Sequence, residues 1–266
     1  MKQENVLAMI LTVNIGNTKI TIGGYADDRQ LFSGKLHTDP LATADEYAIR
    51  IRSLLLLHDI QDTCQIEGCT LGSVVPNVTP HILSALKMLA PVRVLTVGPG
   101  LKSGMRLRLD NPAQLGADLL CGIVAAVARH DGPVVVINAD TALSMMAANS
   151  KKELLGGSIL LSPHLSLPNM VRETAQLPQI DPNTVTNPQI ISTNTTACLQ
   201  SGVVLGTASM IDGMAARFTK VLGSDTRFFA TGSIPDSILH VCETPITYDP
   251  ALILDGLYAI WKRNRK

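Results

Sequence analysis

Two short polar stretches could bind phosphate, and each directly follows a run of apolar residues. The first consists of Asn14, Ile15, Gly16, Asn17 and Thr18, and the second of Asn138, Ala139, Asp140 and Thr141. A glycine lets the backbone approach a ligand closely, and amide or hydroxyl groups beside backbone N–H groups suit phosphate oxygens. Either stretch alone is typical of an ordinary hairpin turn. Because the pattern occurs twice, the sequence favours a pair of phosphate-binding turns.

A carboxylate and a group of basic residues extend this set of candidates. Asp118 begins an apolar segment, residues 119–128, that is predicted to be helical, and a helix dipole stabilises an acid there. An ordinary helix-start acid is the simpler explanation for Asp118. The preceding polar loop, residues 98–111, contains Lys102, Arg106 and Arg108. It is either a solvated connector or the wall of a cleft that attracts an anionic ligand.

The elements that would position these residues recur along the chain. The strand–turn–strand pattern of residues 9–22 recurs at residues 134–147, and the strand at 92–97 resembles the strand at 226–230, which precedes Thr231 and Gly232. We therefore predict a duplicated α/β domain with a ligand cleft between the copies, divided into residues 1–117 and 118–266.

The spacing of apolar residues and the positions of glycine and proline predict the remaining elements. A three-stranded meander is expected over residues 9–37, helices over 42–58, 81–88, 119–128, 165–176, 198–218 and 252–261, and an exposed loop over 177–194. Asn77 or Thr79 is expected to cap the second helix, with Pro80 in its first turn, and Pro168 is expected in the first turn of the fourth.

Composition excludes several classes of function. Lys plus Arg equals Asp plus Glu at 22 each and aromatic residues make up 3%, so a nucleic-acid or anionic-membrane partner is not expected. No apolar run is long enough for a membrane span, and the polar start at residues 1–5 does not predict a signal peptide. The five cysteines are mostly isolated, which is typical of reduced thiols. We expect a cytoplasmic protein.

The chain resembles the type III pantothenate kinases, which belong to the acetate and sugar kinase, Hsp70 and actin superfamily. The resemblance extends from about Leu11 to Leu257 and is strongest in three collinear blocks: residues 100–105, Asp110-Asn111-Pro112 and Gly116-Ala117-Asp118. Several blocks in the same order are far more specific than any one of them.

This resemblance implies two ribonuclease-H-like (actin-like ATPase) domains, a homodimer, and ATP-dependent phosphorylation of pantothenate in coenzyme A biosynthesis. It implies ATP, Mg²⁺ and K⁺ or NH₄⁺ as cofactors, and Asp118 matches the general base. The residues that match ATP contacts are Asn14, Ile15, Gly16, Asn17, Thr18, Lys19, Ile20, Thr21, Thr141, Thr231 and Gly232. Those that match pantothenate contacts are Leu109, Gly116, Ala117, Asp118, Leu119 and Thr195, of which Thr195 would reach across the dimer.

Five positions depart from the family pattern where its chemistry resides. Asn14 and Asn138 replace aspartates that serve Mg²⁺ and the monovalent cation, and an amide carbonyl brings no charge to a hard cation. Asp140 replaces a glycine and would repel phosphate. Leu109 replaces an aromatic residue and Leu119 an arginine of the pantothenate pocket. Each change is compatible with drift, but together they favour impaired or absent kinase activity over normal activity.

Three hypotheses follow from these matches and departures. The chain is a type III pantothenate kinase, with or without an altered cation requirement; or it is a non-catalytic paralogue with a binding or regulatory role; or it phosphorylates another small hydroxyl compound. The third hypothesis rests on Leu109 and Leu119, which make the acceptor pocket more apolar and favour a less acidic substrate.

Overall fold

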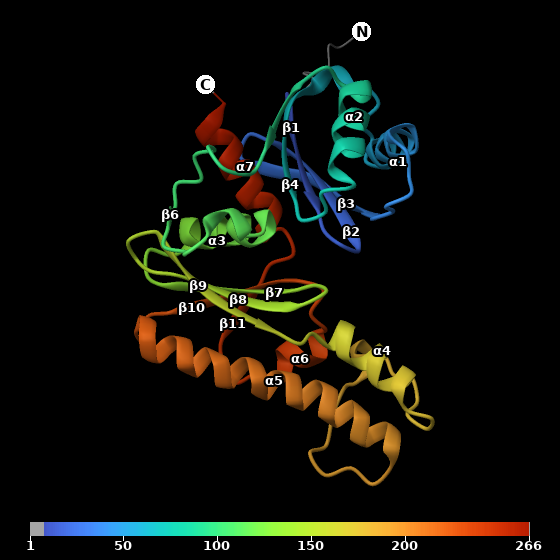
Figure 1. Cartoon of the computed structure of the whole chain (residues 1–266), viewed down its shortest axis with the longest axis vertical. Coiled ribbons are helices and arrows are strands. Elements are labelled where there is room, and N and C mark those ends of the chain that lie inside the picture. Colours follow the sequence, from blue (N-terminus) through green and yellow to red (C-terminus); the bar gives the residue numbers. More distant parts are fainter. Residues whose placement is uncertain (1–7, 266) are drawn as a thin grey trace. The chain divides into compact units, whose positions relative to one another are not determined.

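A computed structural model of the chain describes residues 8–265. The chain forms two compact units (Figure 1). Among the described residues, the first contains residues 8–105, 111–125 and 251–265, and the second contains residues 106–110 and 126–250. The polar start, where no signal peptide is predicted, lies outside the described residues. No helix within residues 8–265 has the length and apolar character that a membrane crossing requires.

The first unit is built on a five-stranded sheet of order β3-β2-β1-β4-β5. Its strands are β1 (Met9–Ile15), β2 (Lys19–Ala26), β3 (Arg29–His37), β4 (Ile66–Ser73) and β5 (Arg93–Thr96). The first three are antiparallel neighbours, whereas β4 is parallel to β1 and β5 is parallel to β4. The meander predicted over residues 9–37 is confirmed.

Helices cover both faces of this sheet. The helices α1 (Ala44–Leu57) and α2 (Thr79–Leu89) lie on one face and α7 (Leu252–Asn264) on the other, while α3 (Ala117–Arg129) packs against α7. Short 3₁₀ turns lie at Thr63–Gln65 and Pro112–Gln114. Alternate residues of β1, including Leu11 and Val13, join the core beneath α1 and α2. Ile10, on the opposite face, packs against Trp261 of α7. Burying each such side chain stabilises the unit by about 1.5–3 kcal/mol, so the sheet is held between helices on both faces.

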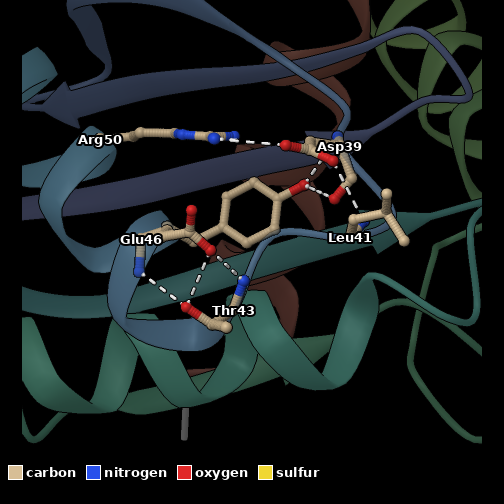
Figure 2. A network of polar contacts seen from close by, with 6 residues as sticks. Asp39, Leu41, Thr43, Glu46 and Arg50 are labelled. Atoms are coloured by element: carbon tan, nitrogen blue, oxygen red, sulfur yellow. Dashed lines mark hydrogen bonds and ion pairs between the residues drawn. The ribbon is translucent and has the colours of Figure 1, made fainter.

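The start of α1 is fixed by a polar network (Figure 2). Thr43 and Glu46 form a reciprocal capping box, in which the Thr43 N–H donates to Glu46 Oε2 at 2.7 Å and the Glu46 N–H donates to Thr43 Oγ1 at 3.3 Å. The Asp39 N–H donates to the hydroxyl of Tyr47 (2.9 Å), which donates back to the Asp39 carbonyl (2.8 Å). The chain that leaves β3 is therefore anchored to α1.

The start of α2 differs from the prediction. The helix begins at Thr79, and its N-cap is Val78, without a side-chain cap hydrogen bond. The Thr79 hydroxyl lies instead 2.7 Å from Ser73 Oγ, to which it donates. The expected capping role of Asn77 or Thr79 is wrong because the end of β4 offers this hydroxyl a nearer acceptor. Pro80 does lie in the first turn.

The second unit repeats this topology. Its sheet has the order β11-β10-β7-β8-β9-β6 and consists of β6 (Arg106–Leu107), β7 (Val134–Ala139), β8 (Leu143–Ala148), β9 (Glu153–Leu160), β10 (Arg227–Gly232) and β11 (Ile246–Tyr248). Without β6, the order β9-β8-β7-β10-β11 has the same strand directions as β3-β2-β1-β4-β5. The predicted duplication is confirmed.

One predicted correspondence between the halves is wrong. The sequence pattern matches the strand at 92–97 to the strand at 226–230. In the structure, β5 occupies the fifth place of its sheet and β10 the fourth, so β4 is the counterpart of β10. Loop composition suggested the match, whereas strand pairing decides it. The counterpart of β5 is β11, a three-residue strand that the sequence pattern did not reveal.

Helices of the second unit are α4 (Pro163–Glu173), α5 (Thr195–Leu222) and α6 (Asp236–Val241), with a 3₁₀ turn at Pro182–Thr184. One face of β7, carrying Val135 and Ile137, packs with residues of α5 and α6. Pro163, not Pro168, occupies the first turn of α4, and Pro168 lies inside the helix, so that prediction is wrong. Most of the segment 177–194 is loop, as expected.

The compact units group the chain differently from the predicted division at residues 117 and 118. Residues 117–125 of α3 belong to the first unit and residues 126–129 to the second, while α7 belongs to the first unit. The apolar residues of α7, including Leu254 and Leu257, form a core with Tyr25 and Cys121 there. The predicted division remains a prediction about the repeated halves.

Candidate active site

The predicted first phosphate turn links β1 to β2 in the first unit. Asn14 pairs with Thr21 and Ile15 with Ile20, and the Gly16 N–H closes the turn by donating to the Lys19 carbonyl (2.9 Å). This pairing places Asn17, Thr18 and Lys19 at the exposed tip, while Ile15, Gly16 and Ile20 are buried. The turn therefore presents its polar residues from a rigid base.

Thr38, which sequence reasoning did not single out, holds this turn from behind. Its hydroxyl donates to the Gly16 carbonyl (2.7 Å) and its N–H donates to the Thr18 carbonyl (3.1 Å). Thr38 is buried and directly precedes Asp39 of the network in Figure 2. A threonine at the end of an edge strand gave no signal of this contact, because its partner lies 22 residues away.

Asn14 presents a buried amide oxygen at the carboxyl end of the central strand β1. Among the described residues, Asn14 Oδ1 has no hydrogen-bond partner. Buried polar atoms usually have a protein or water partner, so an unmatched oxygen on a strand end marks a position where a ligand or water is expected. Asn14 also lies opposite Gly72 of the parallel strand β4.

Gly72 brings Asn14 and the start of α3 together within the first unit. A methyl group added at Gly72 would lie 3.4 Å from Cβ of Ala117 and 3.8 Å from Oδ1 of Asn14. The carboxyl ends of β1 and β4 thus meet the beginning of the helix that carries Asp118. Gly72 was not among the predicted site residues, although a small residue at a strand end is compatible with such a close approach.

Asp118 lies half-buried in the first turn of α3. Its carboxylate folds back over Gly116, where an added methyl group would lie 2.6 Å from Asp118 Oδ1. Gly116 therefore provides the space that the carboxylate occupies. Burial, together with the negative charge of Asp118, raises the pKa of the Cys121 thiol, which keeps this cysteine protonated and chemically inert. Ala117 is buried and Leu119 is half-buried beside Asp118.

The second unit places the two predicted nucleotide turns side by side. Asn138 pairs with Thr231 and Ala139 with Gly232 across the parallel strands β7 and β10. Gly232 has a φ of 91°, and an added methyl group would lie 2.4 Å from the Ala139 carbonyl oxygen and 3.0 Å from Asn138 Oδ1. Only glycine allows this close approach. Thr141 Oγ1 is buried and has no hydrogen-bond partner among the described residues.

Two residues at the start of α4 tie these turns together. The buried hydroxyl of Ser162 donates to the Asp140 carbonyl (3.1 Å) and also accepts the His164 N–H (3.3 Å). The His164 ring contacts the Ser233 carbonyl beside Gly232. The sequence contained a signal for Ser162, since serine followed by proline is a helix-start pattern. Nothing in the sequence pointed to His164.

The remaining predicted pocket residues lie elsewhere in the second unit. Leu109 follows β6 and lies over β9, because its Cδ2 would be 3.7 Å from a methyl group at Gly156. Thr195 is exposed as the first residue of α5. Strands β8 and β9 separate β6 from β7, so within this unit Leu109 is not brought next to Asn138.

Comparison with known proteins identifies relatives along most of the chain. A family model described as type III pantothenate kinase matches residues 10–217. The type III pantothenate kinase of an Exiguobacterium species (strain AT1b) is 34% identical, with 97% of this chain and 100% of the relative covered. That of a Roseiflexus species (strain RS-1) is 35% identical over the same shares of the two chains.

Solved structures share the fold at lower identity. A Campylobacter jejuni protein described as a Baf family transcriptional activator has a TM-score of 0.60 and 18% identity, covering 96% of this chain and 98% of its own. A ROK family glucokinase from Streptomyces griseus, in complex with glucose and AMPPNP, has a TM-score of 0.53 and 14% identity, covering 97% and 99%. These similarities agree with the duplicated ribonuclease-H-like fold.

Proposed function

Because the chain belongs to the type III pantothenate kinase family, we propose that it catalyses the ATP-dependent phosphorylation of pantothenate. The observation that carries this proposal is the approach of Asn14 and the start of α3 at Gly72. This approach supports the proposal, because Asn14 leads into the predicted phosphate turn and Ala117 directly precedes Asp118, the predicted general base. The predicted ligand cleft between the two halves stays a prediction.

The proposed reaction assigns Asp118 the role of general base. The pantothenate hydroxyl oxygen forms a bond to the γ-phosphorus of ATP as the bond to the β,γ-bridging oxygen breaks, and ADP leaves. The hydroxyl proton passes to the Asp118 carboxylate. Because such transition states are loose, positioning contributes more than basicity. The absence of a side chain at Gly116 leaves room for the carboxylate in this orientation, which supports this role.

Magnesium would accompany ATP as its charge-neutralising cation. Among the described residues, no three His, Cys, Asp or Glu side chains converge on a metal site. Mg²⁺ is commonly held by substrate phosphates, water and only one or two protein ligands, so the neutral Asn14 Oδ1 fits a single weak contact. Asn138 would likewise offer a neutral oxygen to K⁺ or NH₄⁺. We expect weaker cation binding than with aspartate at either position.

The decisive experiment measures transfer of phosphate from ATP to radiolabelled pantothenate by the purified protein. The assay compares Mg²⁺ with Mn²⁺ and K⁺ with NH₄⁺. We expect wild-type turnover, and a loss of about 10²–10⁴-fold in kcat for Asp118→Asn, the usual range for a general base. Asp131→Asn is the matched control, because Asp131 is an exposed acid just beyond the other end of α3.

Two outcomes would count against the proposal. Equal inactivity of wild type and Asp118→Asn under every cation condition would exclude the phosphorylation of pantothenate. In that case a thermal shift with millimolar Mg-ATP distinguishes a nucleotide-binding paralogue from a protein that has lost the nucleotide site, since a ligand that binds only the folded state stabilises it. Turnover of other small hydroxyl compounds without turnover of pantothenate would favour a different acceptor.

We also propose a homodimer, as the family resemblance implies. The structure supports it at α5, where Gly202 and Gly206 lie on an uncovered face: a methyl group added at either residue would meet no atom within 4 Å. These residues line a cavity of about 480 Å³ together with Ile190 and Ile191, which are 80% and 85% exposed. Such apolar exposure is typical of an interface. Light scattering should give twice the chain mass of 28.4 kDa, and the mass of a single chain would refute the dimer.

A further inference from the structure

Glu153, the first residue of β9, is an almost buried carboxylate outside the predicted site, with its side chain 12% exposed. Three donors converge on its Oε1 atom: Arg108 Nε at 3.0 Å, Arg108 Nη2 at 2.7 Å and Arg106 Nη1 at 3.3 Å. Both arginines belong to the polar loop that was expected either to be a connector or to attract an anion. Their charges are instead directed at Glu153.

The second oxygen of Glu153 is also satisfied. Asn149 Nδ2 donates to Glu153 Oε2 at 2.9 Å, and Asn149 Oδ1 accepts the Glu153 N–H at 3.0 Å. The side-chain hydrogen bond from Asn149, with those from Arg108 and Arg106 and the Arg108 charge, lowers the pKa of Glu153 to about 2. The carboxylate is therefore ionised at neutral pH and has a full set of partners, as expected for a retained charge at a nearly buried position.

Backbone pairing alone gives β6 little support. The strand has two residues, and its contacts to β9 are the hydrogen bonds from Arg106 N to the Lys152 carbonyl (3.0 Å) and from Arg108 N to the Leu154 carbonyl (2.8 Å). Hydrogen bonds between ionised groups are about twice as strong as neutral ones. The contacts to Glu153 therefore add three charge-assisted hydrogen bonds to the two backbone bonds that hold this segment on the sheet.

Leu109 follows Arg108 directly and lies over Gly156, three residues beyond Glu153 on β9. A shift of residues 106–108 along β9 would therefore also move Leu109 away from Gly156. We propose that Glu153 is a positioning residue for the acceptor substrate, which clamps residues 106–110 so that Leu109 keeps its place as a wall of the pantothenate pocket. This inference rests on the proposed function and on the family resemblance, which matches Leu109 to a pantothenate contact.

The test uses Glu153→Gln, which removes the charge but keeps the shape. Glu173→Gln is the matched control, because Glu173 pairs with Arg172 on the open surface, where the two side chains are 71% and 72% exposed. Limited digestion with trypsin, followed by mass spectrometry, reports the release of the loop through cleavage after Arg106 and Arg108. We expect cleavage there to be about tenfold faster in Glu153→Gln and unchanged in Glu173→Gln.

Steady-state kinetics then separate a positioning role from a merely structural one. We expect the KM for pantothenate to rise about tenfold in Glu153→Gln, with kcat and the KM for ATP within about twofold of wild type. Glu153→Asp, which keeps the charge, should recover part of both effects. If Glu153→Gln does not fold, as judged by circular dichroism, Arg108→Gln removes two of the three donors from the other side of the same contact.

Each result decides between the alternatives. Unchanged tryptic cleavage overturns the clamp, whatever the activity. Faster cleavage with an unchanged KM for pantothenate overturns its role in the acceptor pocket. If the wild type shows no turnover, equilibrium dialysis with radiolabelled pantothenate replaces the KM, and weaker binding by Glu153→Gln supports the proposal. A wild type that neither turns over nor binds pantothenate refutes the proposed function and the substrate role, while the digestion still decides whether the clamp exists.

Discussion

Replacing Gly232 with alanine tests whether the nucleoside turn depends on its close approach to β7. The added methyl group would lie 2.4 Å from the Ala139 carbonyl oxygen, at a φ of 91° that side chains rarely adopt. The backbone strain costs about 1–3 kcal/mol, and steric overlap in a packed site adds about 1–3 kcal/mol. The sum, about 2–6 kcal/mol, is large enough for the turn to move rather than remain strained.

Movement of this turn would break identifiable contacts. The Ser233 N–H donates to the Ala139 carbonyl at 2.5 Å, and the Tyr248 hydroxyl donates to the Gly232 carbonyl at 3.0 Å. We therefore expect Gly232→Ala to lower the free energy of unfolding in urea by about 2–6 kcal/mol. We also expect the KM for ATP to rise at least about tenfold, which corresponds to 1.4 kcal/mol.

Gly223→Ala separates backbone strain from close approach. Gly223, at the end of α5, also has a positive φ of 105°, but an added methyl group there would meet no atom within 4 Å. In this control the free energy of unfolding should fall only by the cost of backbone strain, about 1–3 kcal/mol, and the KM for ATP should stay at the wild-type value. Equal losses of stability in the two variants, or an unchanged KM for ATP in Gly232→Ala, would refute the reasoning.

Three further predictions concern contacts that hold the site in place. Thr38→Val removes the hydroxyl that donates to the Gly16 carbonyl, so we expect the free energy of unfolding in urea to fall by about 1–3 kcal/mol and the KM for ATP to rise. The control Thr174→Val removes an exposed hydrogen bond of the same 2.7 Å length and should change neither quantity. Ser162→Ala removes a helix cap and the hydrogen bond to the Asp140 carbonyl, so the free energy of unfolding should fall by about 0.5–2 kcal/mol and the KM for ATP should rise. An unchanged KM would show that the turn at residues 138–141 keeps its conformation without Ser162. The folded-state pKa of Glu153, about 2, is below its usual 4.5, so the stabilisation by its charge is present above pH 4.5 and is lost as the pH falls toward 2. The urea unfolding midpoints of wild type and Glu153→Gln should therefore converge over that pH range. A constant difference between the two midpoints would contradict the lowered pKa of Glu153.

Local sequence patterns predicted the elements that carry the site. Apolar runs ending at Asn14 and Asn138 predicted the strands and their turns, because alternation and β-branched residues report a buried strand wherever it occurs. The same logic placed Asp118 in the first turn of a helix, and collinear motifs placed the chain in its family. These features depend on neighbours within a few residues, so no knowledge of strand pairing was needed.

Predictions that depended on distant partners were less successful. The caps expected for α2 were wrong because Ser73, at the end of β4, offers the Thr79 hydroxyl a nearer acceptor. Pro168 was placed wrongly because α4 begins earlier than predicted, at Pro163. The short strands β6 and β11 carry too few residues for a period to be visible. The match of β5 with β10 failed because similar loops can follow strands in different places of a sheet.

The sequence by itself therefore determined that this protein is a duplicated α/β chain of the type III pantothenate kinase family, with neutral amides where acids are expected. Only the tertiary structure decided that Gly72 joins Asn14 to the start of α3, that Thr38 supports the first turn, and that the arginines of the polar loop serve Glu153. The Arg108–Glu153 contact spans 45 residues. Contacts of this kind arise from strand order and register, which bring together residues whose local patterns contain no trace of each other.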